Sequence, residues 1–400
     1  MLYVLLFVAV FAGFQGGRYY LANRLQEAGI ASALLLYAIG AWRGLFRLSL
    51  TEWRRWVFAP ALLIGGIMMG SAVVFAVKYA GNITYSFFSA REFLLAFVGP
   101  GVYLLGRTGV PVPAMQRVVW VAIVALMINY LIFYFTMDLK AAFFSSDHTV
   151  SNLVTYDEWR GFRLKPPLFA IMVGLLASLI VFIQARKFAA FLLAVAVLSL
   201  AAYIWSIVQF RATLAALTLS ILLYPVFLSQ ARRVPLALVL LPLGLLALPW
   251  AVAEVLEVFR GAEGGGIRAR AFMAAFDHFT SHWMLGAGED SAYGMSYQDI
   301  VAPWFFPSDI GLAGTAFKYG LVGVALYLWM HGKIWWNLWR AHLYHRETAG
   351  RQDPLLWALL IFMTAQTFNL ALNPGLAYAQ GITLGAIALA LARLALPTQD

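Results

Sequence analysis

The sequence predicts an all-α, polytopic membrane protein of about twelve transmembrane helices. Of its 400 residues, 62% are hydrophobic and 12% are charged, whereas soluble domains average about 45–50% and about 25%. That much apolar surface cannot be hidden inside one water-soluble globule. Apolar runs close to the roughly 20 residues that cross a bilayer recur along the chain, and basic residues concentrate in every second connection between them.

Twelve apolar segments carry this prediction, and we treat residues 1–400 as one integral membrane domain. The segments are 1–14, 28–42, 56–77, 87–106, 118–137, 167–184, 188–209, 212–229, 234–253, 309–331, 354–372 and 375–396. The first has no basic stretch before it and no convincing small-residue cleavage site after it. We therefore expect a retained helix rather than a signal peptide.

The connections between segments alternate in charge. Five alternate connections are basic: 43–55, 107–117, 185–187, 230–233 and 332–353. Together they hold only three acidic residues. Basic loops stay in the cytoplasm, so we expect these five and both termini there. The net charge of +10, from 28 Lys and Arg against 18 Asp and Glu, then reflects topology, and we expect no nucleic-acid partner.

Two long connections face the opposite side, at 138–166 and at 254–308, the latter between helices nine and ten. Together with Asp309 they hold twelve of the eighteen acids. Long loops without structure of their own are uncommon unless they are functional. Within the second, apolar residues at helical spacing predict a helix over 267–281, after a flexible run of three glycines.

Three arginines are candidates for binding an anion. Arg211 lies between two apolar runs with almost no connecting loop, and Arg268 and Arg270 lie early in the second long connection. A guanidinium group fits phosphate oxygens with two parallel hydrogen bonds. The alternative for Arg211 is an interfacial side chain that reaches for water, and the other two could be solvated surface charges.

Several other polar groups are candidates for the same region. His282 precedes a turn with Gly286 and Gly288, and Ser308-Asp309 opens the tenth apolar segment, where Asp309 could be a helix cap or a base. Lys318 lies nine residues into that segment, where an ionisable group is a functional candidate by default. We expect it to pair with Glu92 or to bind substrate, and Arg91-Glu92 could form an ion pair of its own.

The sequence predicts neither a metal nor a cofactor. There is no cysteine, which removes disulfides, thiolate ligands and thiol nucleophiles. His278 and His282 are four residues apart but lack the intervening Glu of the helical zinc-protease motif. The chain contains no phosphate-binding P-loop and no dinucleotide fingerprint.

With these motifs in place, the chain resembles the O-antigen ligase and O-antigen polymerase (Wzy-type) superfamily. The layout is similar over the whole chain, and the motifs over about 205–325. They are Phe210-Arg211-Ala212, an Arg early in the large loop, the turn from His282 to Gly288, and Ser308-Asp309 followed by Tyr319-Gly320 and Gly323. Polymerases of this type carry an Arg-x10-Gly pattern, which Arg163 and Gly174 match. Ligases usually carry a His where this chain has Asp309, which favours a polymerase.

The resemblance implies a GT-C-like membrane glycosyltransferase of the bacterial inner membrane. It would transfer a glycan from undecaprenyl diphosphate to a sugar hydroxyl at the periplasmic face, by direct, inverting displacement without a metal. Arg211, Arg268 and Arg270 would stabilise the diphosphate leaving group. Asp309 is the first candidate for the base. The lesser candidates for the base are Glu289, Asp290 and His282, and Arg163 and Lys318 would help to bind substrate.

Other functions remain open at this point. The same resemblance allows a ligase that transfers the glycan to lipid A-core, and a polymerase of this kind could need a chain-length-regulating membrane protein as partner. From a different class, twelve helices suit a secondary transporter, although the three-residue connection 185–187 is much shorter than the central cytoplasmic link of major-facilitator folds. A structural assembly partner would tolerate replacement of Arg211 and of the loop arginines.

Overall fold

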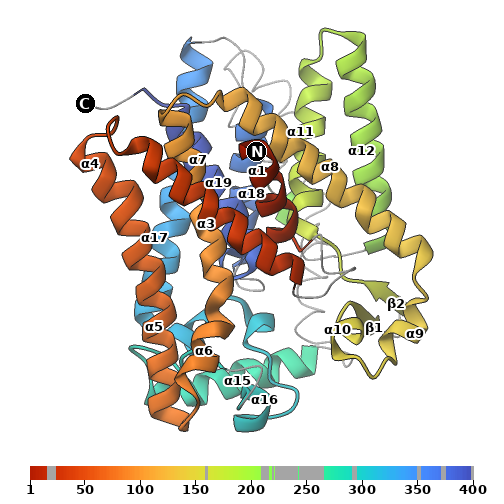
Figure 1. Ribbon diagram of the computed structural model, residues 1–400. Helices are drawn as coiled ribbons and strands as arrows, with labels where there is room; N and C mark the ends of the chain where they lie inside the picture. Colours follow the sequence, from red (N-terminus) through yellow and green to blue (C-terminus); the bar gives the residue numbers. More distant parts are fainter. Residues whose placement is uncertain are drawn as a thin grey trace.

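In the computed structural model the chain is a bundle of helices (Figure 1). The structure describes residues 1–15, 24–157, 161–208, 216–218, 220, 242, 265–290, 295–348, 353–370 and 375–397. The statements below concern these residues. The expected segments 212–229 and 234–253 lie almost entirely outside the described residues. Arg211 also lies outside them.

The first half of the chain contains most of the long helices. Its elements are α1 (Leu2–Gly13), α3 (Arg24–Gly44), α4 (Leu50–Trp53), the π-helix η1 (Arg54–Phe58), α5 (Ala59–Tyr79), α6 (Ile83–Ser89), the 3-10 helix η2 (Ala90–Phe97), α7 (Val98–Arg107), α8 (Val112–Thr136), α9 (Leu139–Phe143), α10 (His148–Ser151), β1 (Val154–Asp157), β2 (Gly161–Leu164), α11 (Leu168–Gln184) and α12 (Phe188–Val208).

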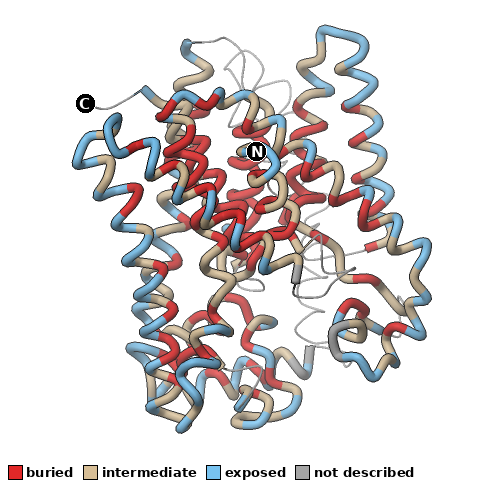
Figure 2. Tube along the Cα trace, in the orientation of Figure 1, coloured by how far each residue is buried: buried red, intermediate tan, exposed pale blue. Residues whose placement is uncertain are grey.

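The second half adds α15 (Gly265–Ser281), α16 (Tyr297–Ile300), the 3-10 helix η4 (Pro307–Ile310), α17 (Gly311–Thr348), α18 (Pro354–Asn369), the 3-10 turn η5 (Gly375–Ala377) and α19 (Ala379–Leu394). The elements α1, α7, α18 and α19 form the centre of the bundle, where buried residues concentrate (Figure 2). At the edge, α5 keeps apolar residues such as Leu62 and Val77 exposed, as expected of a surface that faces lipid.

The described helices confirm an all-α membrane protein. Six helical stretches are long and apolar enough to cross a bilayer: Leu25–Gly44, Leu50–Tyr79, Ile83–Arg107, Val112–Thr136, Phe188–Val208 and Pro307–Thr348. Four shorter apolar helices correspond to expected segments as well: α1, α11, α18 and α19. The expected helix over 267–281 is α15.

One expectation about the connections is corrected and another gains detail. Residues 332–348, expected in a loop, are helical, because α17 continues to Thr348. The sequence from Lys333 to Thr348 has neither Pro nor Gly, and Trp335, Trp339 and His342 stack along this helix. The first long connection contains an antiparallel hairpin of β1 and β2, with Val154 opposite Leu164.

The two ends of the bundle differ in the connections they hold. The helix α4 and the turn between α11 and α12 lie at the upper end in Figure 1, together with the C-terminus. We call this the basic end, because it carries the expected basic connections. The elements α9, β1, β2, α15 and α16 lie at the lower end, which we call the loop end.

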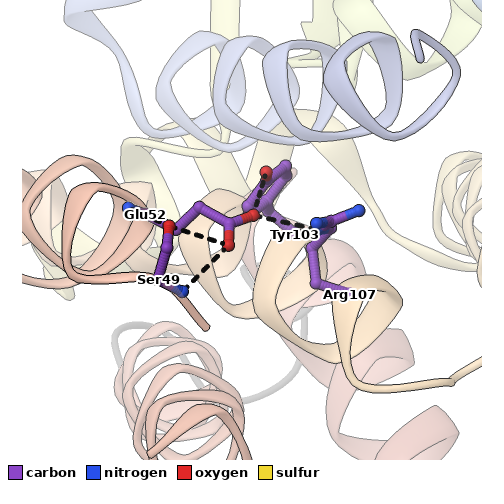
Figure 3. Close-up of polar contacts among 4 residues, drawn as sticks. All are labelled: Ser49, Glu52, Tyr103 and Arg107. Atoms are coloured by element: carbon purple, nitrogen blue, oxygen red, sulfur yellow. Dashed lines mark hydrogen bonds and ion pairs between the residues drawn. The ribbon is translucent and has the colours of Figure 1, made fainter. Parts of the chain in front are cut away.

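One carboxylate organises the polar contacts around α4 at the basic end (Figure 3). Arg107 Nε donates to Glu52 Oε1 at 3.0 Å, and the Tyr103 hydroxyl donates to the same oxygen at 3.4 Å. The other oxygen, Oε2, accepts from the backbone N–H and the hydroxyl of Ser49, which caps α4 in a capping box. Both oxygens of Glu52 are therefore used.

Candidate functional site

The helix α17 is broken inside its apolar stretch. Gly320 has φ 64° and ψ −166°, a conformation outside the helical region that favours glycine. A break of this kind frees backbone groups that lipid cannot satisfy. These groups are satisfied by the segment that follows α15, which crosses α17 at this point.

Four backbone hydrogen bonds join the two segments at the crossing. The N–H groups of Ala287 and Gly288 donate to the carbonyls of Phe317 and Lys318, at 2.7 and 2.8 Å. In return, the N–H groups of Leu321 and Val322 donate to the carbonyls of Trp283 and Met284, at 2.8 and 3.2 Å. The broken helix and the turn thus complete each other.

Glycine permits this close approach. Gly286 has φ 69°, and a Cβ atom there would lie 2.5 Å from Gly320 N and Lys318 O. A Cβ atom on Gly320 would overlap the carbonyl oxygen of Met284. The sequence features His282 to Gly288 and Tyr319-Gly320, which carry the family resemblance, are therefore the two sides of one crossing.

The crossing brings Glu289 against α17. Lys318 Nζ donates to Glu289 Oε1 at 2.6 Å, and the Tyr319 hydroxyl donates to Oε2. Glu289 is buried, with 9% of the residue exposed. The sequence suggested that Lys318 pairs with Glu92 or binds substrate, and the direct pair with Glu92 is wrong. Glu92 lies within electrostatic range of Lys318. Its own hydrogen-bond donors are Gln26 Nε2, at 2.7 Å, and the N–H of Ala379, at 3.2 Å.

The expected Arg91–Glu92 ion pair is also corrected. Arg91 Nη1 instead donates to the Phe88 carbonyl at 3.0 Å. Glu92 contacts the start of α19 instead, through the N–H of Ala379.

These groups line a polar cavity of about 230 Å³. Glu92, Glu289 and Lys318 contribute charge, and Tyr319 and Tyr378 contribute hydroxyls. Thr315 also lines it, is buried, and its Oγ1 has no hydrogen-bond partner among the described residues. A buried hydroxyl without a partner is costly, so this atom is available to a bound polar ligand.

A second, apolar cavity of about 480 Å³ adjoins the first. It lies between α5, α17 and α19, with walls such as Ile67, Val74 and Leu326. The two cavities share five lining residues: Phe93, Thr315, Tyr319, Ala377 and Ile382. Together they form one amphipathic site. We call the apolar cavity the groove and the other the polar cavity.

The other candidate residues lie at different distances from this site. Asp309 follows Ser308, which lines the polar cavity. Arg268 and Asp309 both act electrostatically on Tyr378, another lining residue. Asp309 is exposed and accepts from the Ser308 hydroxyl at 3.3 Å. Arg270 is exposed, donates to the Gly266 carbonyl and lies 5.5 Å from the Trp304 ring.

Two loop residues next to the site titrate away from their ordinary range. Burial raises the pKa of Asp290, against the opposing charge of Lys318, and Asp290 accepts from the N–H of Tyr297 at 3.1 Å. Burial and then the charge of Lys78 lower the pKa of His282. His282 is therefore neutral at pH 7, and its Nδ1 contacts the Ser281 hydroxyl.

Arg163 belongs to another part of the molecule. It lies in β2 and its Nη1 donates to the carbonyl of Val208, at the end of α12. Neither Arg163 nor Gly174 lines the polar cavity or the groove. The expected pattern of Arg163 and Gly174 therefore does not join the polar cavity.

Three further groups complete the site: Tyr319, Thr315 and Tyr378. Tyr319 belongs to the motif Tyr319-Gly320 and is adjacent to Lys318, so the sequence could have pointed to it. Thr315 and Tyr378 reach the cavity through the packing of α17 against α19, which no local pattern reveals.

In comparisons with known proteins, no family model matches the chain, and no curated protein sequence matches it.

Proposed function

We propose that the chain is a membrane glycosyltransferase that transfers a glycan from undecaprenyl diphosphate to a sugar hydroxyl, most simply as a polysaccharide polymerase. The observation that supports this best is the amphipathic site. An apolar groove of this size suits a polyprenyl chain, and a polar cavity with two carboxylates suits sugar hydroxyls, which are hydrogen-bond donors. The sequence resemblance points to the same substrates.

The reaction would be one inverting displacement. The acceptor hydroxyl oxygen attacks the anomeric carbon, the bond from that carbon to the diphosphate oxygen breaks, and the electron pair leaves with the diphosphate. Arg268, which acts electrostatically on Tyr378 of the cavity, would stabilise the leaving charge. Of the other two arginines suggested for this role, Arg270 is exposed and Arg211 lies outside the described residues.

Glu289 is our first candidate for the base that takes the proton of the acceptor. It is buried in the polar cavity and held in place by Lys318 and Tyr319, and a base must come within hydrogen-bond distance of the hydroxyl. Asp309, favoured from the sequence, is exposed and follows Ser308, which lines the cavity, and it is the second candidate.

The test uses purified full-length protein in nanodiscs with a lipid-linked oligosaccharide, alone and with lipid A-core. A ladder of lipid-linked products identifies a polymerase, and glycan attached to the core identifies a ligase. We expect Glu289→Gln to lower transfer by about a hundredfold or more, and Asp309→Asn and the control Glu52→Gln to change it little.

Thermal unfolding and donor binding are measured for each variant, so that loss of transfer is separated from loss of fold. The opposite pattern, with transfer lost in Asp309→Asn and kept in Glu289→Gln, would make Asp309 the base. Absence of any covalent product with every acceptor would argue against a transferase.

A secondary transporter is the second candidate, because one observation favours it. Transporters often bind substrate where a membrane helix is broken, and α17 is broken at Gly320 beside the polar cavity. Uptake of an intact labelled glycan into vesicles, without covalent transfer, would identify a transporter.

A further inference from the structure

The basic end holds a cluster of cations that the proposed reaction does not use. Arg55 of η1 and Arg393 of α19 act electrostatically on Lys333 of α17. Arg393 in turn lies within electrostatic range of Arg55 and of Arg340. Four basic side chains from three elements therefore share one region, which we call the cation cluster.

The packing of the helices explains this convergence. Ile334 meets α19 at Gly385, which brings the neighbouring Lys333 toward that helix. Leu394 meets α7 at Gly106, so Arg393 lies beside the end of α7. Trp56 stacks on Tyr103 with ring centroids 3.8 Å apart, which fixes η1, and with it Arg55, against the same helix.

The nearby carboxylate does not neutralise the cluster. Glu52 uses one oxygen for Arg107 and Tyr103 and the other for Ser49 (Figure 3). Among the described residues, no member of the cluster forms an ion pair with a carboxylate. Like charges that share one region repel one another, and an anion bound among them would reduce that cost.

The surroundings favour an anion that belongs to a lipid. Trp329 and Trp336, on the same helix as Lys333, are 53% and 55% exposed. Phe58, in η1 with Arg55, is 54% exposed. Lys333 Nζ lies 4.4 Å from the Trp329 ring. Exposed tryptophans next to cations are typical of the headgroup layer of a bilayer, and basic pockets between membrane helices bind anionic headgroups.

We propose that the cation cluster of Arg55, Lys333, Arg340 and Arg393 binds the phosphate group of an anionic phospholipid headgroup. This site is at the opposite end of the bundle from the polar cavity, and it is independent of the proposed transfer reaction. Free inorganic phosphate offers the same chemistry without the chain, so the experiment includes both.

The test measures binding to the purified full chain in detergent, by native mass spectrometry and by the shift in unfolding temperature. The probes are phosphatidylglycerol, zwitterionic phosphatidylcholine and inorganic phosphate at equal concentration. We expect phosphatidylglycerol to bind and stabilise more than the other two. The double variant Arg340→Gln/Arg393→Gln should bind it about thirtyfold more weakly, which corresponds to about 2 kcal/mol for two charges.

The matched control is Arg43→Gln/Arg117→Gln, which removes two exposed arginines from the same end and should keep the wild-type preference. Equal binding of both lipids by the wild type, or an unchanged preference in the cluster variant, would overturn the proposal. Equal stabilisation by inorganic phosphate would overturn the assignment to a lipid. If the double variant does not fold, raising the salt concentration on the wild type decides: phosphatidylglycerol binding must fall if the contact is ionic.

Discussion

Two glutamates of this protein each hold a cation, at opposite ends of the bundle, and their surroundings differ. Glu52 pairs with Arg107 at 3.0 Å, with side-chain exposures of 23% and 32%. Glu289 pairs with Lys318 at 2.6 Å, with exposures of 12% and 25%. The first carboxylate also caps α4 through Ser49, three residues away. The second is placed by a turn that crosses a broken helix.

The difference shows what separates a structural ion pair from a candidate site. Both oxygens of Glu52 accept hydrogen bonds that hold local structure: one from Ser49 at the start of α4 and one from Arg107 of α7. Glu289 has partners as well, but it also lines a cavity that continues into an apolar groove and that includes the unpartnered hydroxyl of Thr315. A partner alone is therefore a weak indicator, and a partner beside an accessible cavity is a stronger one.

The largest expected effect comes from a change at the crossing. Gly320→Ala forces a side chain into a left-handed position and against the Met284 carbonyl. A strained backbone costs about 1–3 kcal/mol, and overpacking adds about as much. We expect this variant to lose most of its stability in thermal unfolding in detergent.

The matched control for that variant is Gly161→Ala. Gly161 has φ 65°, nearly the value at Gly320, but a Cβ atom there would meet nothing within 4 Å. An alanine there therefore has a positive φ, as at Gly320, but not the clash. If both variants lose equal stability, the close crossing contributes nothing beyond the strained backbone.

The two ion pairs can be compared directly by removing each cation. Lys318→Met leaves Glu289 buried without its charge partner, which costs about 3 kcal/mol or more. Arg107→Met removes a partner that is 32% exposed, and pairs near the surface contribute about 0–1 kcal/mol. Unfolding temperatures of the two variants should therefore differ clearly. Equal losses would mean that the two pairs are equivalent and that burial of Glu289 has little energetic consequence.

Much of the helical framework was predictable from the sequence, because apolar length and loop charge are local properties. The helix α15 follows from the spacing of Ala271 and Ala275, which are buried as expected. The sequence does not predict the continuation of α17 past residue 331, because basic residues indicate a loop there although they also occupy the ends of long helices.

The site was predictable only in part. Glu289 and Lys318 were both candidates, but their pairing joins residues 29 positions apart through the turn at Gly286. Contacts of this kind depend on how the chain crosses itself, and no spacing in the sequence encodes the partner. The same holds for Glu92, whose partners Gln26 and Ala379 come from opposite ends of the chain.

The smallest expected effect concerns Asp290, the residue after Glu289. It is an effect on how the stability of the protein depends on pH. Burial raises the pKa of Asp290 above its usual 3.8, so the folded protein holds this proton more tightly than the unfolded chain does. Stability must then fall as the pH rises from the unfolded-state pKa through the folded-state value.

Asp290→Asn tests this expectation. The amide oxygen can still accept from the N–H of Tyr297, and the charge that burial disfavours is gone. We expect the variant to unfold at a slightly higher temperature than the wild type at pH 7. The difference should shrink as the pH falls below 3.8, the ordinary pKa, because Asp290 then becomes protonated in both states. A variant that is less stable than the wild type at pH 7 would show that the negative charge of Asp290 is used, most directly against Lys318, and that the carboxylates next to the polar cavity act together.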